Sequence, residues 1–344
     1  MRLALDAMGG DHAPGVVLEA VRLAVVRWPE LSIKLVGLPD QLPDLNLPQV
    51  ERVACGSVIT MDDSPLAALR QKRDSSIAVA LDLHRQGVVD AVVSAGSTGA
   101  QVAASMKHLG RIDNLRRPAI ISVLPTSGGP LVLLDVGASS DAGAADLLQY
   151  AWMGHCYANT VHGIKQPKVG LLSIGEEPGK GNRVVVEAHA LLRSSGLNFI
   201  GNLEGRDILA GKADVLVCDG FTGNVVLKFA ESILPLLKSR LGGHIRGHWL
   251  RLAGALLLRP AIHELKQEFN YEEYGGAPLV GVNGTSIICH GSSSAAALVS
   301  AIGVARSMVD GDLNARIRAE LERTVAALAA DTARNGTPGD TPAA

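Results

Sequence analysis

Glycine, carboxylate, hydroxyl and imidazole groups gather in six short segments of this sequence of 344 residues. The first reads "LALDAMGGDHAP" from Leu3 to Pro14 and holds two glycines, two carboxylates and one histidine within seven residues. The other five begin at Ser94, Asp135, Ile174, Asp219 and His290. Glycines let backbone N–H groups point at an anion, and hydroxyl groups add further donors. These residue types favour binding of phosphate or a similar oxyanion.

The candidate anion-binding residues are small or polar, and each follows an apolar run. They are Asp6, Gly9, Gly10, Asp11, Ser97, Thr98, Gly99, Gly181, Asn182, Asp219, Gly220, Gly223, Lys228, Gly291, Ser292 and Ser293. A single loop of this kind also occurs in proteins that bind no phosphate, so the interpretation depends on the number of loops. The three aspartates have a second interpretation, as helix caps or orienting groups, which is strongest for Asp11.

Two lysines and two histidines in these segments could carry charge or a proton. Lys180 and Lys228 could neutralise a phosphate or a developing oxyanion, and Lys228 lies one helical turn after Asn224. His12 and His290 could donate a proton to a leaving group. The alternatives are solvated surface lysines and histidines with a purely structural hydrogen bond. Cys218 and Cys289 lie inside apolar runs and are expected to be inert packing residues.

The elements that position these loops are short aliphatic runs alternating with segments of helical spacing. The strand-like runs are 2–6, 32–37, 90–96, 119–125, 131–137, 168–175, 214–220 and 286–291. The helix-like segments are 15–27, 76–86, 99–109, 142–160, 184–195, 223–241 and 293–309. This alternation predicts an α/β fold with a mainly parallel sheet and helices on both faces. The carboxyl ends of such strands would all lie at one edge of the sheet. Residues 119–135 are predicted to form a hairpin, because "TSGG" leaves no room for a helix.

Composition excludes several classes of protein. A net charge of −2 and 3% aromatic residues argue against nucleic-acid binding. The sequence has neither G-x-G-x-x-G nor a P-loop, and its four cysteines lack metal-ligand spacing. We therefore expect no cofactor and no metal, a reducing cytoplasm, and no signal peptide or membrane-spanning helix. With no clear linker, residues 1–332 are expected to form one catalytic unit, and 333–344 a disordered tail.

Eight segments, taken in order, resemble the PlsX family of bacterial phosphate acyltransferases. They are "LALDAMGGDHAP", "SAGSTGA", "RRPAIISVLPT", "LDVGA", "GLLSIGEEPGKGN", "NFIGNLEGRDI", "CDGFTGNVVLK" and "YGGAPLVGVNG…IICHGSS", which extend from about residue 2 to 309. Three positions depart from the family pattern: the stretch 138–146, Ser97 in place of asparagine, and Arg183 in place of an acidic residue.

The resemblance implies that a long acyl chain moves from acyl carrier protein to inorganic phosphate. The acyl phosphate formed would serve phospholipid synthesis through a glycerol-3-phosphate acyltransferase. The resemblance also implies a three-layer αβα fold similar to isocitrate and isopropylmalate dehydrogenases and to phosphotransacetylase, and no nucleotide or metal. It further implies a homodimer that is peripheral at the inner face of the cell membrane.

For that reaction, we assign Lys180 and Asn224 to binding of the phosphate and stabilisation of the oxyanion. Ser97, Thr98 and Ser292 would be further anion donors, and His12 or His290 would assist proton transfer. Phosphate can attack a thioester directly because a thiol is a fair leaving group, so no enzyme nucleophile is required.

An apolar segment within 240–270 is expected to protrude. Its predicted membrane contacts are Trp249, Leu250, Leu256, Leu257 and Leu258, flanked by Arg246, Arg251, Arg259 and Lys266. The alternative is a helical hairpin packed in a dimer interface. Acidic acyl carrier protein would dock on a basic patch. The sequence leaves two patches open, Arg111 with Arg116 and Arg117, or the arginines of 246–259.

Three other functions remain open at this point. A phosphotransacetylase acting on coenzyme A thioesters would share the reaction type, but would leave the apolar segment 249–258 without a purpose. An isopropylmalate-type dehydrogenase would require an aspartate cluster and a nicotinamide site, which are not evident in the sequence. A membrane scaffold without activity would leave the six glycine-rich segments unexplained.

Overall fold

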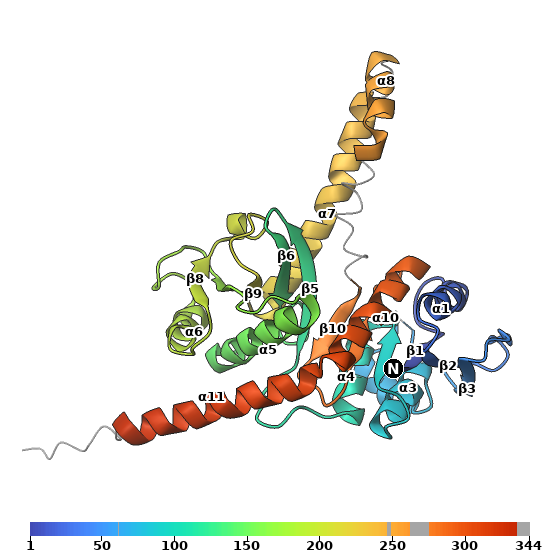
Figure 1. Ribbon diagram of the computed structural model, residues 1–344, viewed down its shortest axis with the longest axis horizontal. Coiled ribbons are helices and arrows are strands. Elements are labelled where there is room, and N and C mark those ends of the chain that lie inside the picture. Colours follow the sequence, from blue (N-terminus) through green and yellow to red (C-terminus); the bar gives the residue numbers. More distant parts are fainter. Residues whose placement is uncertain (61, 246–248, 262–274, 336–344) are drawn as a thin grey trace, which may run out of the picture.

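Two layers of helices cover one central sheet in the computed structural model, which describes residues 1–60, 62–245, 249–261 and 275–335 (Figure 1). In these residues eleven strands form the sheet, in the order β3-β2-β1-β4-β11-β10-β5-β6-β9-β7-β8. The strands are β1 (Arg2–Asp6), β2 (Ser32–Gly37), β3 (Val50–Ala54), β4 (Ala91–Ser94), β5 (Ala119–Thr126), β6 (Gly129–Leu134), β7 (Val169–Leu172), β8 (Phe199–Leu203), β9 (Val215–Val217), β10 (Ala277–Val280) and β11 (Ser286–Ile288).

Alternate residues of the strands face opposite helical layers. Leu3 and Leu5 of β1 belong to the core beneath one layer, and Ala4 between them belongs to the core beneath the other. The first layer holds α1 (Gly15–Arg27), α5 (Ala144–His162), α6 (Arg183–Arg193), α10 (Ala295–Asp310) and α11 (Leu313–Asn335). The second holds α2 (Pro65–Gln71), α3 (Ser76–Arg85), α4 (Thr98–His108) and the start of α7 (Gly220–Ile245). The predicted three-layer αβα fold with a mainly parallel sheet is therefore confirmed.

The sheet reverses direction near its middle, which the sequence did not predict. β1 to β4 and β11 are parallel to one another, and β6 to β9 form a second parallel group. Between the groups, β10 is antiparallel to β11 and to β5, and β5 forms the predicted hairpin with β6. The turn Thr126–Gly129 is too short for a crossover, so β6 must run back along β5. The expectation of six strand ends at one sheet edge was therefore wrong.

The register nevertheless brings carboxyl ends from both groups to the same level. Ile288 of β11 pairs with Ala277 of β10. Because Leu279 of β10 pairs with Ile120, Ala277 lies level with Ser122 of β5. Ser122 in turn pairs with Leu133 of β6. β11 and β6 thus end at the same height, although they run in opposite directions. Loops from the two parallel groups can therefore line one site at the junction of β10 and β5.

The long helix α7 continues past the sheet and, with α8 (Trp249–Leu257), projects from the body (Figure 1). On this arm Leu250 and Leu256 to Leu258 are exposed. Within the described ranges no helix is long and apolar enough to cross a membrane. Arg246, Lys266 and the side chain of Trp249 lie outside the described residues. α11 includes 333–335, the start of the predicted tail, and 336–344 also lies outside the description.

Candidate active site

One cavity of about 350 Å³ opens where the two parallel groups of strands meet. Its polar wall carries Thr98, Asn224, Lys228, Glu231, His290 and Ser293. Its apolar wall comes from β5, the segment after β6, α7, β10 and β11, and includes Ile120, Val123, Val136, Leu227, Ala277 and Ile288. Five of the predicted residues thus share one site, namely Thr98, Asn224, Lys228, His290 and Ser293.

The start of α7 is tied to the loop after β6 by hydrogen bonds and close packing. Asp219 caps the helix, because its carboxylate accepts from Phe221 N, Thr222 N and Thr222 Oγ1. Gly220 N donates to Ser139 O at 2.9 Å, and Gly223 N donates to Asp219 O at 2.9 Å. All four first-turn N–H groups are therefore occupied, so Asp219 and Gly220 shape the site and this helix end offers the anion no free N–H.

Asp135 organises the loop on which α7 rests. Its buried carboxylate accepts hydrogen bonds from the backbone N–H groups of Ile120, Gly137, Ala138 and Ser139. Burial raises the pKa of Asp135 above its ordinary value, and these four donors oppose that shift. A Cβ on Gly223 would lie well under 3.0 Å from the Asp135 carbonyl oxygen, so only glycine fits there. Asp135 was not among the residues predicted from the sequence, although it stands in "LDVGA".

The α4 N-terminus differs from that of α7 because it lacks a capping side chain. Ser97 occupies the N-cap position without a side-chain cap hydrogen bond, and Thr98 begins the helix at the cavity. By contrast, Ser294 caps α10 through Ala297 N. An uncapped helix start carries partial positive charge and free N–H groups, so α4 is suited to hold an anion in the cavity.

The loop after β1 supports this helix start from behind. Buried Asp6 accepts from Ser94 Oγ at 2.7 Å and from Met8 N at 3.0 Å, and Ser94 Oγ accepts from Gly96 N. Burial is the largest cause of a raised pKa at Asp6. The loop itself packs too tightly for side chains: a Cβ on Gly9 would lie 2.6 Å from Gly96 N.

The same loop also contacts the segment that follows β11. Asp11 N donates to Gly291 O at 2.7 Å. A Cβ on Gly10 would lie 3.0 Å from that same carbonyl oxygen. The structure thus gives Asp6, Gly9, Gly10 and Asp11 a scaffolding role around the cavity rather than a place in its lining.

The two candidate histidines differ in position. His290 lines the cavity, and its Nδ1 accepts from Ser292 N at 3.2 Å and pairs with Ser292 Oγ at 2.8 Å. Because Nδ1 is an acceptor, the proton of the neutral ring is on Nε2. His12 is exposed and is not among the residues that line the cavity. Of the two histidines, His290 is therefore the one placed to donate a hydrogen bond from Nε2 into the cavity.

One face of α7 contributes three polar groups to the cavity. Asn224, Lys228 and Glu231 follow one another at helical spacing, and Lys228 Nζ is 2.9 Å from Glu231 Oε2. Asn224 and Lys228 were predicted from the sequence, whereas Glu231 was not. Helical spacing could have identified Glu231, because it lies seven residues after Asn224 and therefore on the same face of the helix.

Lys180 does not line the cavity, contrary to its assignment beside Asn224. It is exposed in the loop after β7, where its N–H donates to Glu177 O at 3.0 Å and its carbonyl accepts from Ser173 Oγ at 2.9 Å. Within the described part of the chain, its ammonium group has no ion pair. Asn182 caps α6 by accepting from Val185 N, so it stabilises the helix that follows.

The four cysteines are buried, as predicted for Cys218 and Cys289. Burial raises the pKa of the Cys289 thiol to about 12 and raises that of Cys218 well above its ordinary value. Neither thiol is therefore a thiolate at neutral pH, and a covalent acyl-cysteine intermediate is disfavoured.

Solved structures with a similar fold include a phosphotransacetylase and a phosphotransacylase. A phosphotransacetylase from Streptococcus pyogenes aligns with a TM-score of 0.61 and 16% identity over 90% of this chain and 94% of that one. A branched-chain phosphotransacylase from Enterococcus faecalis V583 aligns with a TM-score of 0.54 and 16% identity over 89% and 99%. At this identity the likeness establishes the fold, which is of the phosphotransacetylase type.

Closer relatives are found by sequence. The family described as "Fatty acid synthesis protein" matches residues 1–316. The chain is 51% identical over 325 residues to a phosphate acyltransferase of Heliobacterium modesticaldum, covering 92% of this chain and 97% of that protein. It is 48% identical over 334 residues to one of Desulfitobacterium hafniense, covering 95% and 99%. The chain belongs to the PlsX family of phosphate acyltransferases and is an enzyme that transfers an acyl group to phosphate. The predicted family is thereby confirmed.

Proposed function

We propose that this enzyme moves a long-chain acyl group from acyl carrier protein to inorganic phosphate, and that the acyl phosphate serves phospholipid synthesis. The observation that carries the proposal is the composition of the cavity. Its polar wall, with Asn224, Lys228, His290 and the start of α4, suits a phosphate anion. Its apolar wall suits an aliphatic chain at the same site.

The proposed reaction is a direct displacement. A phosphate oxygen held at the α4 N-terminus attacks the thioester carbonyl carbon, and a C–O bond forms. Asn224 and Lys228 stabilise the oxyanion of the tetrahedral intermediate. The C–S bond then breaks, and the sulfur departs as a thiolate that takes a proton from water, while the Nε2–H of neutral His290 can donate a hydrogen bond to the phosphate or to the oxyanion. No enzyme nucleophile takes part.

The decisive experiment mixes long-chain acyl carrier protein thioester with inorganic phosphate. Phosphate-dependent release of thiol, together with an acyl phosphate that hydroxylamine traps, is the expected result. A parallel assay with coenzyme A thioesters tests the phosphotransacetylase alternative. If thiol release from the acyl carrier protein thioester is independent of phosphate, or if only coenzyme A thioesters react with phosphate, the proposal fails.

Lys180 is proposed to reach the bound phosphate from the loop after β7, since its backbone is held by two hydrogen bonds while its ammonium has no ion pair within the described residues. Lys180→Ala should lower kcat/KM for phosphate about tenfold or more through loss of one charge-assisted contact. Steady-state kinetics with varied phosphate measure this. The control is Lys165→Ala, at another exposed lysine in the body. Equal turnover in both variants would remove Lys180 from the mechanism.

The projecting arm is proposed to mediate assembly and membrane contact, with residues 1–332 acting as one catalytic unit. Phe221, Val225 and Phe229 of α7 are exposed at a spacing of four residues, and Leu236, Leu237 and Leu241 continue the exposed apolar surface. Such a surface supports a homodimer packed through α7.

The apolar tip supports peripheral contact with the inner face of the cytoplasmic membrane. There the glycerol-3-phosphate acyltransferase would take up the product.

Leu256, Leu257 and Leu258 at the tip are proposed to enter the membrane surface, since they are 63%, 84% and 59% exposed. Replacing all three with serine should abolish most cosedimentation with anionic liposomes, because the buried apolar area provides the binding energy. The control, Ile174→Ser, removes an equally exposed apolar side chain from the body and should sediment as the wild type does. Undiminished liposome binding by the triple variant contradicts this role.

Two basic patches are candidate docking surfaces for acyl carrier protein. Arg116 and Arg117 form ion pairs with Asp141 and Asp146, which reduces the net charge of that patch. The arginines of the arm, Arg251 and Arg259, are exposed. We therefore favour the arm as the docking surface.

A further inference from the structure

The segment between β6 and α5 has no regular secondary structure, yet it supports the cavity. Its Gly137 lines the cavity, and a Cβ placed there would lie 3.9 Å from Asn224 Cγ. Its Ser139 accepts the hydrogen bond from Gly220 N at the first residue of α7. The position of Asn224 therefore depends on the conformation of this segment, residues 135–143.

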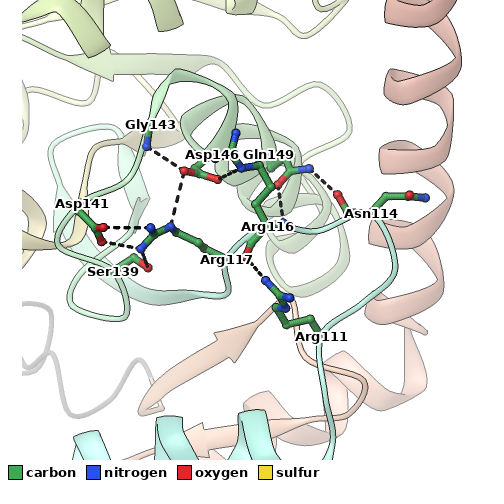
Figure 2. A network of polar contacts seen from close by, with 9 residues as sticks. All are labelled: Arg111, Asn114, Arg116, Arg117, Ser139, Asp141, Gly143, Asp146 and Gln149. Atoms are coloured by element: carbon green, nitrogen blue, oxygen red, sulfur yellow. Dashed lines mark hydrogen bonds and ion pairs between the residues drawn. The ribbon is translucent and has the colours of Figure 1, made fainter.

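Arg117 holds this segment from outside the cavity (Figure 2). Its Nη1 and Nη2 donate to the two carboxylate oxygens of Asp141 at 2.5 and 2.9 Å, and Nη1 also donates to Ser139 Oγ at 3.4 Å. Its Nε lies 3.8 Å from Asp146 Oδ2 at the start of α5. One guanidinium thus contacts two residues of the segment and the helix that follows it.

Buried Asp146 anchors the other side of the network (Figure 2). Its Oδ2 accepts from Gly143 N at 2.8 Å, and its Oδ1 lies 3.3 Å from Arg116 Nε. Gln149 accepts from Arg116 N and donates to Asn114 O, which fixes the chain just before β5. A buried carboxylate of this kind requires its cationic partners, so the arginines are bound in place.

We propose that Arg117 is a positioning residue that sets the place of Asn224 in the cavity. The inference rests on the proposed function, in which Asn224 stabilises the oxyanion. The geometry requires a planar guanidinium group, because Arg117 donates to both carboxylate oxygens of Asp141 while its Nε faces Asp146. A lysine could satisfy only one of these partners at a time. Arg117 acts through Ser139 and Gly220 and does not touch the substrate.

The test compares Arg117→Ala and Arg117→Lys with Arg306→Ala. Arg306 is the matched control because its side chain is 34% exposed, against 36% for Arg117, and because it also pairs with two carboxylates, Glu30 and Asp310. Arg306 lies in α10, outside the cavity lining. Each variant is assayed for kcat and KM, for its melting temperature, and for amide hydrogen exchange in 135–143 and 220–224.

Arg117→Ala should lower kcat on the order of tenfold, raise hydrogen exchange in both segments, and melt within a few degrees of Arg306→Ala. Arg117→Lys should recover only part of the rate. If amide hydrogen exchange in both segments of Arg117→Ala equals that of the wild type, the positioning role is overturned, whatever the value of kcat. A different outcome is raised hydrogen exchange in Arg117→Ala together with wild-type kcat in Asn224→Ala. That outcome would refute the proposed role of Asn224 instead.

Discussion

Replacing Asn224 with alanine should lower kcat for acyl transfer about 10²- to 10³-fold, the usual loss when one oxyanion donor is removed. Asn224 lies in the first turns of α7 and lines the cavity beside Gly137. The first-turn N–H groups of α7 are occupied, so its amide is a donor that this helix can direct into the cavity. The loss should appear in kcat more than in KM, because the oxyanion exists only in the transition state and intermediate.

Steady-state assays of acyl phosphate formation at saturating phosphate measure this effect. Asn198→Ala is the control, because that asparagine is exposed next to β8, away from the cavity lining, where its side chain donates to Gln166 O. Asn198→Ala should keep wild-type kcat. A kcat for Asn224→Ala within twofold of the wild type would contradict the oxyanion role.

Gly223→Ala should destabilise the protein by more than about 3 kcal/mol, or prevent folding, because its Cβ would overlap a backbone carbonyl. The overlap is with Asp135 O, and Cys218 Sγ lies 2.9 Å from the same Cβ position. Backbone of the buried Asp135 segment cannot move aside without loss of the four hydrogen bonds to its carboxylate.

The matched control for Gly223 lies in the same helix. A Cβ on Gly243 would meet no atom within 4 Å, so Gly243→Ala should stabilise α7 by about 0.5–1 kcal/mol. Denaturant unfolding of both variants distinguishes a steric cause from a general intolerance of the helix. Equal stability of the two variants would show that α7 and the Asp135 segment do not pack as described.

The buried strands were the easiest elements to predict. Runs such as 2–6 and 32–37 are aliphatic because both faces of the sheet are covered, and β1 and β2 follow them. Two of the elements that were not predicted lack that signal. β3 reads "VERVA" and is mostly unburied at the edge of the sheet, and α11 mixes polar residues with alanines and only a few larger aliphatic residues.

The site was harder to predict than the fold, because it depends on how the two parallel groups meet. The sequence identified Asn224, His290 and Thr98 by residue type and position after a strand. It also grouped His12 and Lys180 with them, since in a purely parallel sheet all six loops would meet at one edge. His12 follows β1 and Lys180 follows β7, and neither strand adjoins the junction of β10 and β5 where the cavity opens. Predicting it would have required the pairing partner of β10, which local pattern does not encode.

The strand order also determines when the catalytic centre can exist during synthesis. β10 and β11 occupy the middle of the sheet but come from residues 277–288, after the long arm. Until they emerge from the ribosome, β4 and β5 lack their central neighbours and expose unpaired edges. Chain termination within the arm would therefore yield two open half-sheets that are prone to edge-to-edge association and lack His290. The cell thus gains acyl transfer only when these late strands join the two halves.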